Sequence, residues 1–511
     1  MNNRPLHPVG DVSALVSGAL LTLAFAPFAV FPLAALLPAL LLWLCEGASP
    51  RRAALRGALF GLGLYATGIY WIYISLHDYG HAPAAFAALA TFIVVLLMLS
   101  YIAIFAYLLT RLAPRPGPVK WLIIAPALWT LLEWTRSWLF TGFPWLSLGY
   151  SQIDGPLAGL APYLGVFGVG WAVLLSAGLL MLLTWRERLW RIAASTLFIA
   201  LWAGAWGLGQ TSWVDAAGEP VKTSLVQGNI SQTDKFTEDG IVRALTLYTQ
   251  LSWNDAAGSD LIIWPETAIP VFFSDLPPDF LENLTQQAHS SNTDILTGVP
   301  TGDWETRVFY NAVVSLGSQQ GFYRKRRLLP FGEYVPLRFI LNFFHRFVDI
   351  PMADFTPGKR DQPLLYARGH PVGVSICFEA AFGSEIRHAL PQAQFLVNVS
   401  NDAWFGHSLA PYQHLQIARM RALEAGRYLA RATNTGISAL IDERGRIIER
   451  GQLFTTQVLQ GWIQPLSGAT PYALMGDKGI VLLTFVLLVS GVTLSRRQRD
   501  NTNERSDGYE Q

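Results

Sequence analysis

The sequence has little cysteine and little charge. Only two cysteines, Cys45 and Cys377, occur in 511 residues, which excludes a disulfide-stabilised scaffold. Cys45 lies in an apolar stretch and is predicted to be an inert buried thiol. Charged residues make up 14% of the chain, against roughly 25% in an average soluble protein. The net charge of +1 and the absence of long Lys/Arg runs argue against a nucleic-acid partner.

Two common catalytic arrangements are missing as well. No G-x-S-x-G motif is present, and no group of His and Cys residues has metal-ligand spacing. His407 and His414 are the only histidines near motif-like sequence in the polar part of the chain. A Ser/His/Asp hydrolase is therefore not indicated, and we expect no metal site.

Long apolar runs are what the chain has in excess. Hydrophobic residues make up 51% of it and the mean hydropathy is +0.31, which indicates a membrane protein. Residues 12–44 are apolar but interrupted by prolines and are predicted to form two short spans. Six further runs approach or exceed the roughly 20 residues that cross a bilayer: 57–74, 84–109, 121–140, 157–184, 192–208 and 479–494. The total is about eight spans.

Basic loop residues predict the orientation of these spans, because short loops rich in Lys and Arg stay in the cytoplasm. The four clusters are Arg51/Arg52/Arg56, Arg111/Arg115/Lys120, Arg186/Arg188/Arg191 and Arg496/Arg497/Arg499. They place both termini in the cytoplasm. The predicted domains are residues 1–210 with about seven spans, an extracytoplasmic domain at 211–472, and a last span with a cytoplasmic tail at 473–511. The polar tail beyond Arg499 is predicted to be disordered.

The long polar insert has the texture of an α/β or α+β domain. Short β-rich runs at 222–229, 260–266, 294–300, 311–317, 371–379, 395–402 and 437–445 are predicted strands. Apolar residues recur at helical spacing in 240–253, 278–291 and 414–433. About 250 residues suffice for one sizeable core.

Three strand or loop ends of the insert carry residues that strands usually avoid. Glu266 follows "IIWP", Lys325 and Glu333 lie in "YRKRRLLPFGEYVP", and Cys377 and Glu379 lie in "SICFE". Taken singly, these residues are typical of a capping glutamate, a solvated basic run and a core cysteine. Taken together they suggest nucleophilic catalysis, because a cysteine needs a base and a positive charge to bring its pKa below about 8.5.

In this order, Glu266, Lys325 and Cys377 resemble the Glu-Lys-Cys triad of the nitrilase superfamily. The segments "PFGEYVP", "SNDAWFG" and "TGFPWLSLGYSQ", among others, resemble its membrane-integrated branch, the apolipoprotein N-acyltransferases. The resemblance covers most of the chain. It implies a polytopic α-helical membrane domain together with a nitrilase-like α-β-β-α sandwich domain.

The resemblance also implies a role for each residue of the triad. Cys377 would be the nucleophile and Glu266 the general base that deprotonates it. Lys325 would stabilise the oxyanion, with the backbone N–H of Phe378 as a second donor. Among the basic residues of its segment only Lys325 is a compact point charge, which agrees with this assignment.

Further site residues follow from the same resemblance. Glu333 would hold the lysine in register, and Glu379 matches an acidic position of the branch. Four residues are candidate substrate contacts: Trp404, Phe405, Trp145 and Arg136. Two alternatives stay open, namely an ion pair between Glu133 and Arg136 and an interfacial aromatic belt for the tryptophans. Residues 343–358, aromatic and irregular, are a candidate lid.

The implied reaction is a two-step acyl transfer without a cofactor. The sn-1 acyl chain of a phospholipid, phosphatidylethanolamine, would pass to Cys377 as a thioester. The amine of diacylglyceryl-cysteine at the N-terminus of an apolipoprotein would then receive it. The resemblance places a monomeric enzyme in the bacterial inner membrane, with its catalytic domain in the periplasm and membrane lipid around its spans.

Three other functions are alternatives to this one. A transporter would fit the spans but leaves the insert unexplained. A membrane-tethered amidase or nitrilase would use the same triad but pass the acyl group to water, and sequence alone does not separate it from a transferase. A non-catalytic lipoprotein-binding module would make the triad a coincidence.

Overall fold

The computed structural model describes residues 7–334 and 354–507, and the chain divides into two compact units. The first, which we call the helical unit, contains Met1–Tyr70, Leu89–Thr211 and Asp477–Gln511. The second, the α/β unit, contains Ser212–Gly476 together with Trp71–Ala88. This last segment was predicted as the end of a span and an external loop, yet its contacts group it with the insert.

The helical unit consists of apolar helices. Their bounds are α1 His7–Leu21, α2 Leu33–Cys45, α3 Pro50–Gly68, α5 Ala84–Leu112, α6 Ala125–Arg136, α7 Ala161–Leu183, α8 Arg188–Leu208 and α15 Lys478–Asp507. Among the described residues, four helical stretches are long and apolar enough to cross a membrane: Ala84–Leu112, Pro156–Leu183, Arg188–Leu208 and Lys478–Gln498. A pair bent by 47°, Pro50–Gly68 with Trp71–Tyr79, could form a fifth. The count of about eight spans stays a prediction.

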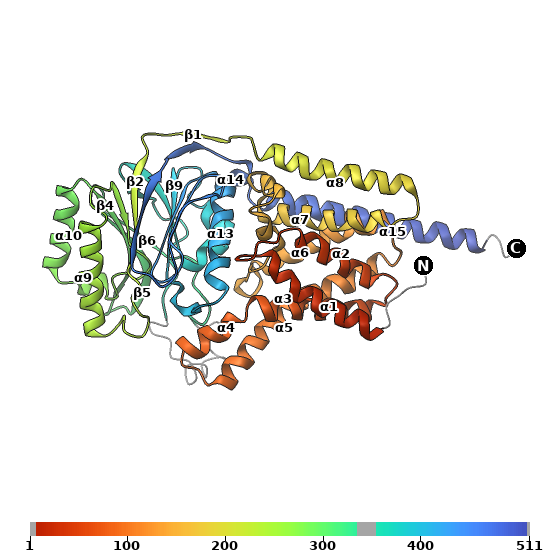
Figure 1. The fold of residues 1–511 in the computed structure, drawn as a ribbon, viewed down its shortest axis with the longest axis horizontal. Helices are drawn as coiled ribbons and strands as arrows, with labels where there is room; N and C mark the ends of the chain where they lie inside the picture. Colours follow the sequence, from red (N-terminus) through yellow and green to blue (C-terminus); the bar gives the residue numbers. More distant parts are fainter. Residues whose placement is uncertain (1–6, 335–353, 508–511) are drawn as a thin grey trace. The chain divides into compact units, whose positions relative to one another are not determined.

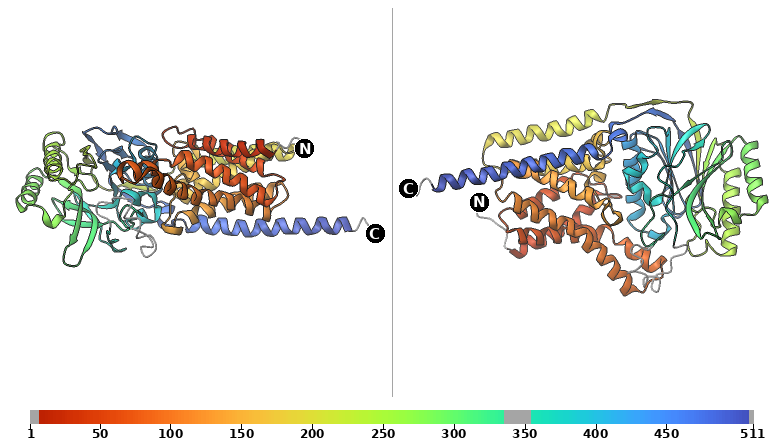
Figure 2. Two further views of the ribbon diagram at one scale, coloured as in Figure 1. Left: turned by 90° about the horizontal axis from the view of Figure 1, so that it is seen from below. Right: turned by 180° about the vertical axis from the view of Figure 1, so that it is seen from behind.

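The helices of this unit differ in how deeply they are buried. The most apolar part of the Pro156–Leu183 stretch is 78% buried, whereas the corresponding parts of α8 and α15 are only 11% and 17% buried. Ile199, Trp206 and Leu482 accordingly expose more than half of their surface. Figure 2 shows α8 in yellow and α15 in blue as long, separate rods. Exposed apolar faces of this size are typical of a lipid-facing surface.

The C-terminal tail differs from its prediction. Helix α15 continues to Asp507, so the residues beyond Arg499 that were predicted to be disordered are helical up to that point. No proline or glycine occurs between Ser495 and Asp507, and nothing in this stretch therefore breaks the helix that begins in the apolar run.

The α/β unit contains two six-stranded sheets with the same plan. The first has the order β13-β2-β3-β4-β5-β6 and the second the order β12-β11-β10-β9-β8-β7. In each, three adjacent parallel strands are flanked by antiparallel ones. The bounds are β2 Val221–Gln227, β3 Leu261–Ile263, β4 Asp294–Asp303, β5 Val308–Leu316, β6 Gly321–Arg324, β7 Leu365–Ala367, β8 His370–Ile376, β9 Phe395–Ser400, β10 Leu429–Thr433, β11 Ala439–Ile441, β12 Ile447–Arg450 and β13 Gln457–Ile463.

The two sheets share one apolar core and carry helices on their other faces. Because side chains alternate along a strand, Leu261 and Ile263 of β3 enter the cluster that also contains Val374 and Val397 of the second sheet. Ile262 instead packs with residues of α9 (Glu238–Asn254) and α10 (Pro278–Ser290). The second sheet packs its other face against α13 (Ala410–Ala425). Figure 1 shows α9 and α10 on one side of the sheets and α13 on the other.

The insert begins and ends in a two-stranded ribbon. Strand β1 (Val214–Ala216) pairs antiparallel with β14 (Leu466–Gly468), and Val214 lies opposite Gly468. The two ends of the insert are therefore held side by side.

One predicted helix is wrong in its second half. The stretch 414–433 has apolar residues at helical spacing, but α13 ends at Ala425 and Leu429–Thr433 forms β10, whose five residues are all buried. Gly426 terminates the helix in the left-handed conformation, with φ 61° and ψ 44°. All seven predicted strand segments of the insert do contain strands.

Candidate active site

The three residues of the predicted triad each follow a strand. Glu266 comes shortly after β3, Lys325 directly after β6 and Cys377 directly after β8. Strand β6 is antiparallel to β5, which is antiparallel to β4, so β6 runs in the same direction as β3. Glu266 and Lys325 therefore lie at the same edge of the first sheet, with Lys325 Nζ 3.6 Å from Glu266 Oε1.

Lys325 is held between two carboxylates in a buried position. Its side chain is 1% exposed, and Nζ donates to Glu333 Oε1 at 2.9 Å. Burial acts to lower the pKa of the lysine, but the charges of Glu333 and Glu266 outweigh it and raise the pKa above its usual value. The ammonium is therefore a permanent positive charge in this site.

Asn311 joins the two glutamates and was not singled out from the sequence. Its Nδ2 donates to Glu266 Oε1 at 2.7 Å and to Glu333 Oε1 at 2.8 Å. It lies near the start of β5, which runs away from the edge where Glu266 lies. An asparagine within the β-rich run "VFYNAVVSL" was the available signal, since strands are depleted in asparagine.

Two more contacts fix Glu266, and sequence reasoning missed both. The backbone N–H of Asn401 donates to Glu266 Oε2 at 2.9 Å. Lys235 Nζ donates to the Glu266 carbonyl at 3.3 Å. Burial lowers the pKa of Lys235 to about 8, with the Glu266 charge opposing the shift. Each carboxylate oxygen of Glu266 thus has a hydrogen-bond donor, which fixes the orientation of the group.

Cys377 occupies a strained position at the end of β8. Its φ is 48°, in the left-handed region that β-carbon-bearing residues rarely adopt. Sequence reasoning expected neighbouring groups to lower the pKa of the thiol, and this was wrong. Burial raises it, the charge of Glu266 raises it further, and Lys325 only partly offsets them. The resting thiol is therefore protonated, and a base has to take its proton before the sulfur can attack a substrate.

Glu379 links the turn that contains Cys377 to the segment that contains Lys325 through hydrogen bonds. Its fully buried carboxylate accepts from the backbone N–H groups of Ile376 at 2.8 Å, Arg326 at 2.7 Å and Arg327 at 3.1 Å, and from Tyr323 Oη at 3.0 Å. Burial raises the pKa of Glu379 to about 6, with these backbone donors opposing the shift. One carboxylate thus sets the spacing between the two chain segments that carry the nucleophile and the cation.

The remaining predicted site residues of the α/β unit are Phe378, which follows Cys377, and Trp404 and Phe405 in the short helical segment Asp402–Phe405. Phe378 is buried, with its ring edge-on to Phe382. Trp404 and Phe405 are half-buried. Trp71 of α4 (Trp71–Ile74) packs edge-on against Phe405, and Ser75 Oγ donates to the Trp404 carbonyl at 2.8 Å. The segment Trp71–Ala88 therefore supports both candidate substrate contacts of the α/β unit.

The other two candidate substrate contacts, Arg136 and Trp145, lie in the helical unit. Both are buried, at 2% exposure. Arg136 donates to the carbonyls of Phe143 at 2.9 Å and Trp145 at 2.6 Å and to Ser147 Oγ at 3.0 Å, and it lies 3.9 Å from Glu133. The short distance to Glu133 matches the alternative given above, an ion pair between Glu133 and Arg136. A substrate contact by either residue stays a prediction.

Most of the candidate lid, residues 343–353, lies outside the described residues. Its described end, 354–358, adjoins the site. The backbone N–H groups of Asp354 and Phe355 donate to the Glu333 carbonyl at 3.1 and 3.0 Å, and that of Gly358 donates to the Lys325 carbonyl at 2.8 Å.

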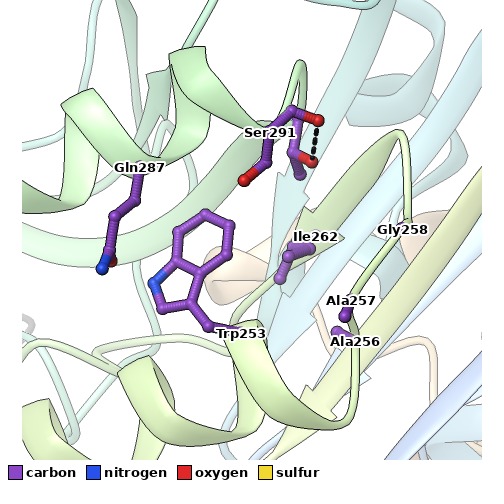
Figure 3. A pocket seen from close by; sticks show the side chains of 8 residues that line it. Trp253, Ala256, Ala257, Gly258, Ile262, Gln287 and Ser291 are labelled. Atoms are coloured by element: carbon purple, nitrogen blue, oxygen red, sulfur yellow. Dashed lines mark hydrogen bonds between the residues drawn. The ribbon is translucent and has the colours of Figure 1, made fainter.

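A pocket elsewhere in the α/β unit is not this site. A hollow of about 200 Å³ is lined by Trp253, Ala256, Ala257, Gly258, Ile262, Gln287, Ser291 and Thr293. Figure 3 shows it from close by. Gly258 precedes β3 and Thr293 precedes β4, so the hollow lies at the edge opposite Glu266. In the described part of the chain, no group of three or more His, Cys, Asp and Glu residues could hold a metal ion.

Comparisons with known proteins identify the family. Residues 17–179 match the apolipoprotein N-acyltransferase N-terminal domain, and residues 222–472 match the carbon-nitrogen hydrolase family. A protein of Methylococcus capsulatus named apolipoprotein N-acyltransferase is 42% identical, and the match covers 96% of this chain and 97% of that protein. Proteins of the same name from Nitrosomonas europaea and Azotobacter vinelandii are 42% and 43% identical, over 94% and 97% of this chain and 96% and 97% of theirs. The chain therefore belongs to the apolipoprotein N-acyltransferase family and carries a carbon-nitrogen hydrolase domain of the nitrilase superfamily.

Proposed function

We propose that this protein is the acyltransferase that completes lipoprotein biosynthesis, moving an acyl chain from a phospholipid to the N-terminal amine of an apolipoprotein through a thioester on Cys377. One observation carries the proposal. A buried carboxylate–lysine–carboxylate group, Glu266–Lys325–Glu333, adjoins a strained cysteine in a chain that also has apolar, exposed helices. Both substrates carry acyl chains, and a membrane protein can hold them without removing those chains from lipid.

In the first half-reaction, Cys377 Sγ attacks the ester carbonyl while its proton passes to Glu266. The carbonyl oxygen becomes an oxyanion, which Lys325 Nζ and the N–H of Phe378 stabilise. When the tetrahedral intermediate collapses, the C–O bond breaks and Glu266 returns the proton to the departing alcohol. The products are a thioester and a lysophospholipid.

In the second half-reaction, the free amine of diacylglyceryl-cysteine attacks the thioester carbonyl. Glu266 takes a proton from the attacking nitrogen, and the same two donors stabilise the second oxyanion. The C–S bond then breaks, and the proton held by Glu266 restores the Cys377 thiol. An amide replaces the thioester, which gives a triacylated lipoprotein and the resting enzyme.

The finer assignments belong to the same proposal. We infer phosphatidylethanolamine as the donor through its sn-1 chain, diacylglyceryl apolipoprotein as the acceptor, no cofactor and a monomeric enzyme. Residues 1–210 and 473–511 would together supply about eight spans in the inner membrane of a bacterium. Residues 211–472 would form an α-β-β-α sandwich in the periplasm, with both termini in the cytoplasm. The bacterial relatives and the apolar helices are consistent with an inner-membrane protein.

Mass spectrometry of the purified protein after incubation with phosphatidylethanolamine, without an acceptor, tests the first half-reaction. We expect a fatty-acyl mass on the Cys377 peptide that hydroxylamine releases. The Cys45→Ala variant, which removes the other cysteine, should keep the adduct, and the Cys377→Ala variant should lose it.

A diacylglyceryl-cysteine peptide added afterwards should remove the adduct and gain its mass. Free fatty acid in place of acylated peptide would identify a hydrolase. Phospholipid turnover that persists in Cys377→Ala would show that the triad assignment is wrong.

A further inference from the structure

The carbonyl of Cys377, rather than its thiol, has a buried histidine as its partner. His414 of α13 is 1% exposed, and its Nε2 lies 3.1 Å from the Cys377 carbonyl oxygen. A carbonyl oxygen only accepts hydrogen bonds, so Nε2 carries the proton in this contact. The reaction described above assigns His414 no role.

Two charged residues fix the orientation of the His414 ring. Arg431 Nη2 lies 3.0 Å from Nδ1, and Asp402 Oδ1 lies 3.0 Å from the same atom. Arg431 also donates to Asp402 Oδ2 at 2.8 Å, and neither residue exposes more than 1% of its surface. Burial and the Arg431 charge lower the pKa of His414, whereas Asp402 and the bond to the Cys377 carbonyl oppose the shift. The contact with the Cys377 carbonyl requires the proton on Nε2 whether or not Nδ1 is also protonated, because a carbonyl oxygen has no proton to donate.

Residues that contact Asp402 and Arg431 also connect them to Cys377 and to the strand before it. Ser400 Oγ donates to Asp402 Oδ1 at 2.9 Å and also interacts with the Cys377 thiol. Arg431 also donates to Asn398 Oδ1, and Asn398 Nδ2 donates to Ser375 Oγ at 3.0 Å. Strands β8, β9 and β10 and helix α13 each supply a member of this network, so its geometry follows from the packing of the second sheet.

The bonded carbonyl belongs to the same peptide group as the N–H of Phe378. Because that peptide is trans, its C=O and N–H point in opposite directions, and holding one therefore aims the other. The position needs such support, because a φ of 48° is strained for a residue that carries a β-carbon. Glu379 already holds the Ser375–Ile376 peptide through the Ile376 N–H, and His414 holds the Cys377–Phe378 peptide.

We propose that His414 is a positioning residue of the oxyanion hole: its Nε2–H holds the Cys377 carbonyl so that the Phe378 N–H points at the oxyanion of the acyl ester. The bond also polarises the peptide, which makes that N–H a better donor. The inference rests on the proposed function, in which the Phe378 N–H is an oxyanion donor. His414 touches neither the thiol nor the substrate in this role.

Two substitutions distinguish the loss of the His414 N–H donor from the loss of the rest of its side chain. His414→Leu keeps an apolar side chain but has no N–H. His414→Gln keeps an amide N–H at a reach similar to that of Nε2. His388→Leu removes an exposed histidine of the same unit and serves as the control.

Two reactions of the same cysteine are then compared in the full-length protein. Thioester formation from phosphatidylethanolamine passes through an oxyanion. Alkylation of Cys377 by iodoacetamide, measured on its own peptide, displaces iodide without forming one. We expect His414→Leu to slow thioester formation about 10- to 100-fold, a part of the 10²–10³ that a whole oxyanion donor supplies, while alkylation changes no more than about 3-fold. His414→Gln and His388→Leu should behave like the unaltered protein in both.

The inference is overturned if His414→Leu slows both reactions equally, if it slows neither, or if His414→Gln is as slow as His414→Leu. Should the leucine variant not accumulate, His414→Asn replaces it, because the same amide on a shorter side chain does not reach the carbonyl. Failure of the unaltered protein to form any thioester, with normal alkylation of Cys377, would overturn the proposed function and this inference with it.

Discussion

At the scale of single residues, the site depends on one amide that serves two carboxylates. Asn311 donates to both Glu266 and Glu333, and Lys325 lies between the same two groups. The amide donates to both carboxylates without adding charge, which a second lysine would do. The base and the cation that stabilises the oxyanion can therefore lie close together with a neutral donor beside them.

Asn311→Asp tests this arrangement with an almost isosteric change. A third carboxylate would face two others at hydrogen-bond distance, so one of them must bind a proton and the base is lost or misplaced. We expect thioester formation to fall at least about 100-fold, the lower bound for losing a general base. Asn229→Asp is the control, because its Nδ2 donates to the Phe454 carbonyl instead. Activity within a few-fold of normal in Asn311→Asp would refute the role given to the amide.

Glu379 makes a prediction about pH and stability. Its pKa is raised from 4.5 to about 6 by burial, so the folded protein binds this proton more tightly than the unfolded chain. The contribution is fully present below pH 4.5 and is lost as the pH rises through 6, in total about 2 kcal/mol. The unfolding temperature of the unaltered protein, relative to Glu379→Gln, should therefore fall between pH 4 and pH 7. Glu282 is an exposed residue of α10, and the same comparison with Glu282→Gln should show no such pH trend. An unfolding temperature of the unaltered protein that instead rises relative to Glu379→Gln between pH 4 and pH 7 would contradict the assignment.

At the scale of elements, the boundary between α13 and β10 decides where the His414 and Arg431 side chains meet. The helix has to stop at Ala425 for the chain to return as β10, and Gly426 makes the stop with φ 61°. A β-carbon at this position would lie 2.9 Å from Thr470 Cγ2 and 3.2 Å from Val214 Cγ1. The glycine is therefore required both by its backbone angle and by the available space.

Gly426→Ala should cost more stability than Gly369→Ala. Gly369 has a similarly left-handed backbone, with φ 77°, but nothing within 4 Å of its missing β-carbon. The shared backbone term is about 1–2 kcal/mol, and crowding at Gly426 should add about 1 kcal/mol or more. Denaturant or thermal unfolding of the two variants measures the difference. Equal losses would show that Thr470 and Val214 move aside freely.

Sequence patterns predicted the elements of the α/β unit better than their ends or their contacts. Buried strands such as Phe395–Ser400 are local apolar runs, so they could be read directly. The switch at Gly426 could not, because Leu429–Thr433 continues the helical spacing and becomes a strand only through pairing with β9 and β11. The triad was proposed from its motif and stays a prediction, whereas the two hydrogen bonds of Asn311 and the raised pKa of the Cys377 thiol depend on neighbours distant in sequence.

At the scale of the whole molecule, the chain combines two units with different surfaces. The helical unit leaves apolar side chains of α8 and α15 exposed, whereas the α/β unit encloses its apolar residues between and beside two sheets. Such a division fits a protein that is partly in lipid and partly in water. In the proposed topology the α/β unit lies on the periplasmic side of the membrane.

The low cysteine content makes that orientation measurable. In a background with Cys45→Ala and Cys377→Ala no cysteine remains. We expect Glu305→Cys, exposed in the α/β unit, to react with a membrane-impermeant maleimide in intact spheroplasts. Arg188→Cys, exposed at the start of α8 within a basic cluster, should react only after permeabilisation. The reverse pattern would invert the proposed topology.

The ribbon of β1 and β14 has a consequence for how the α/β unit can be handled. Val214 and Gly468 lie opposite each other, so the two ends of the segment 214–468 are close together. This segment could therefore be excised, or circularly permuted, without stretching the chain. The excised piece would nevertheless lack Trp71, whose Nε1 donates to Gln413 Oε1 at 3.2 Å, and Ser75, which holds the Trp404 carbonyl. A fragment that keeps the triad would therefore lose the packing of Trp71 against Phe405 and the hydrogen bond of Ser75 to the Trp404 carbonyl. To retain these contacts, the fragment would have to be made with residues 71–88 grafted back on.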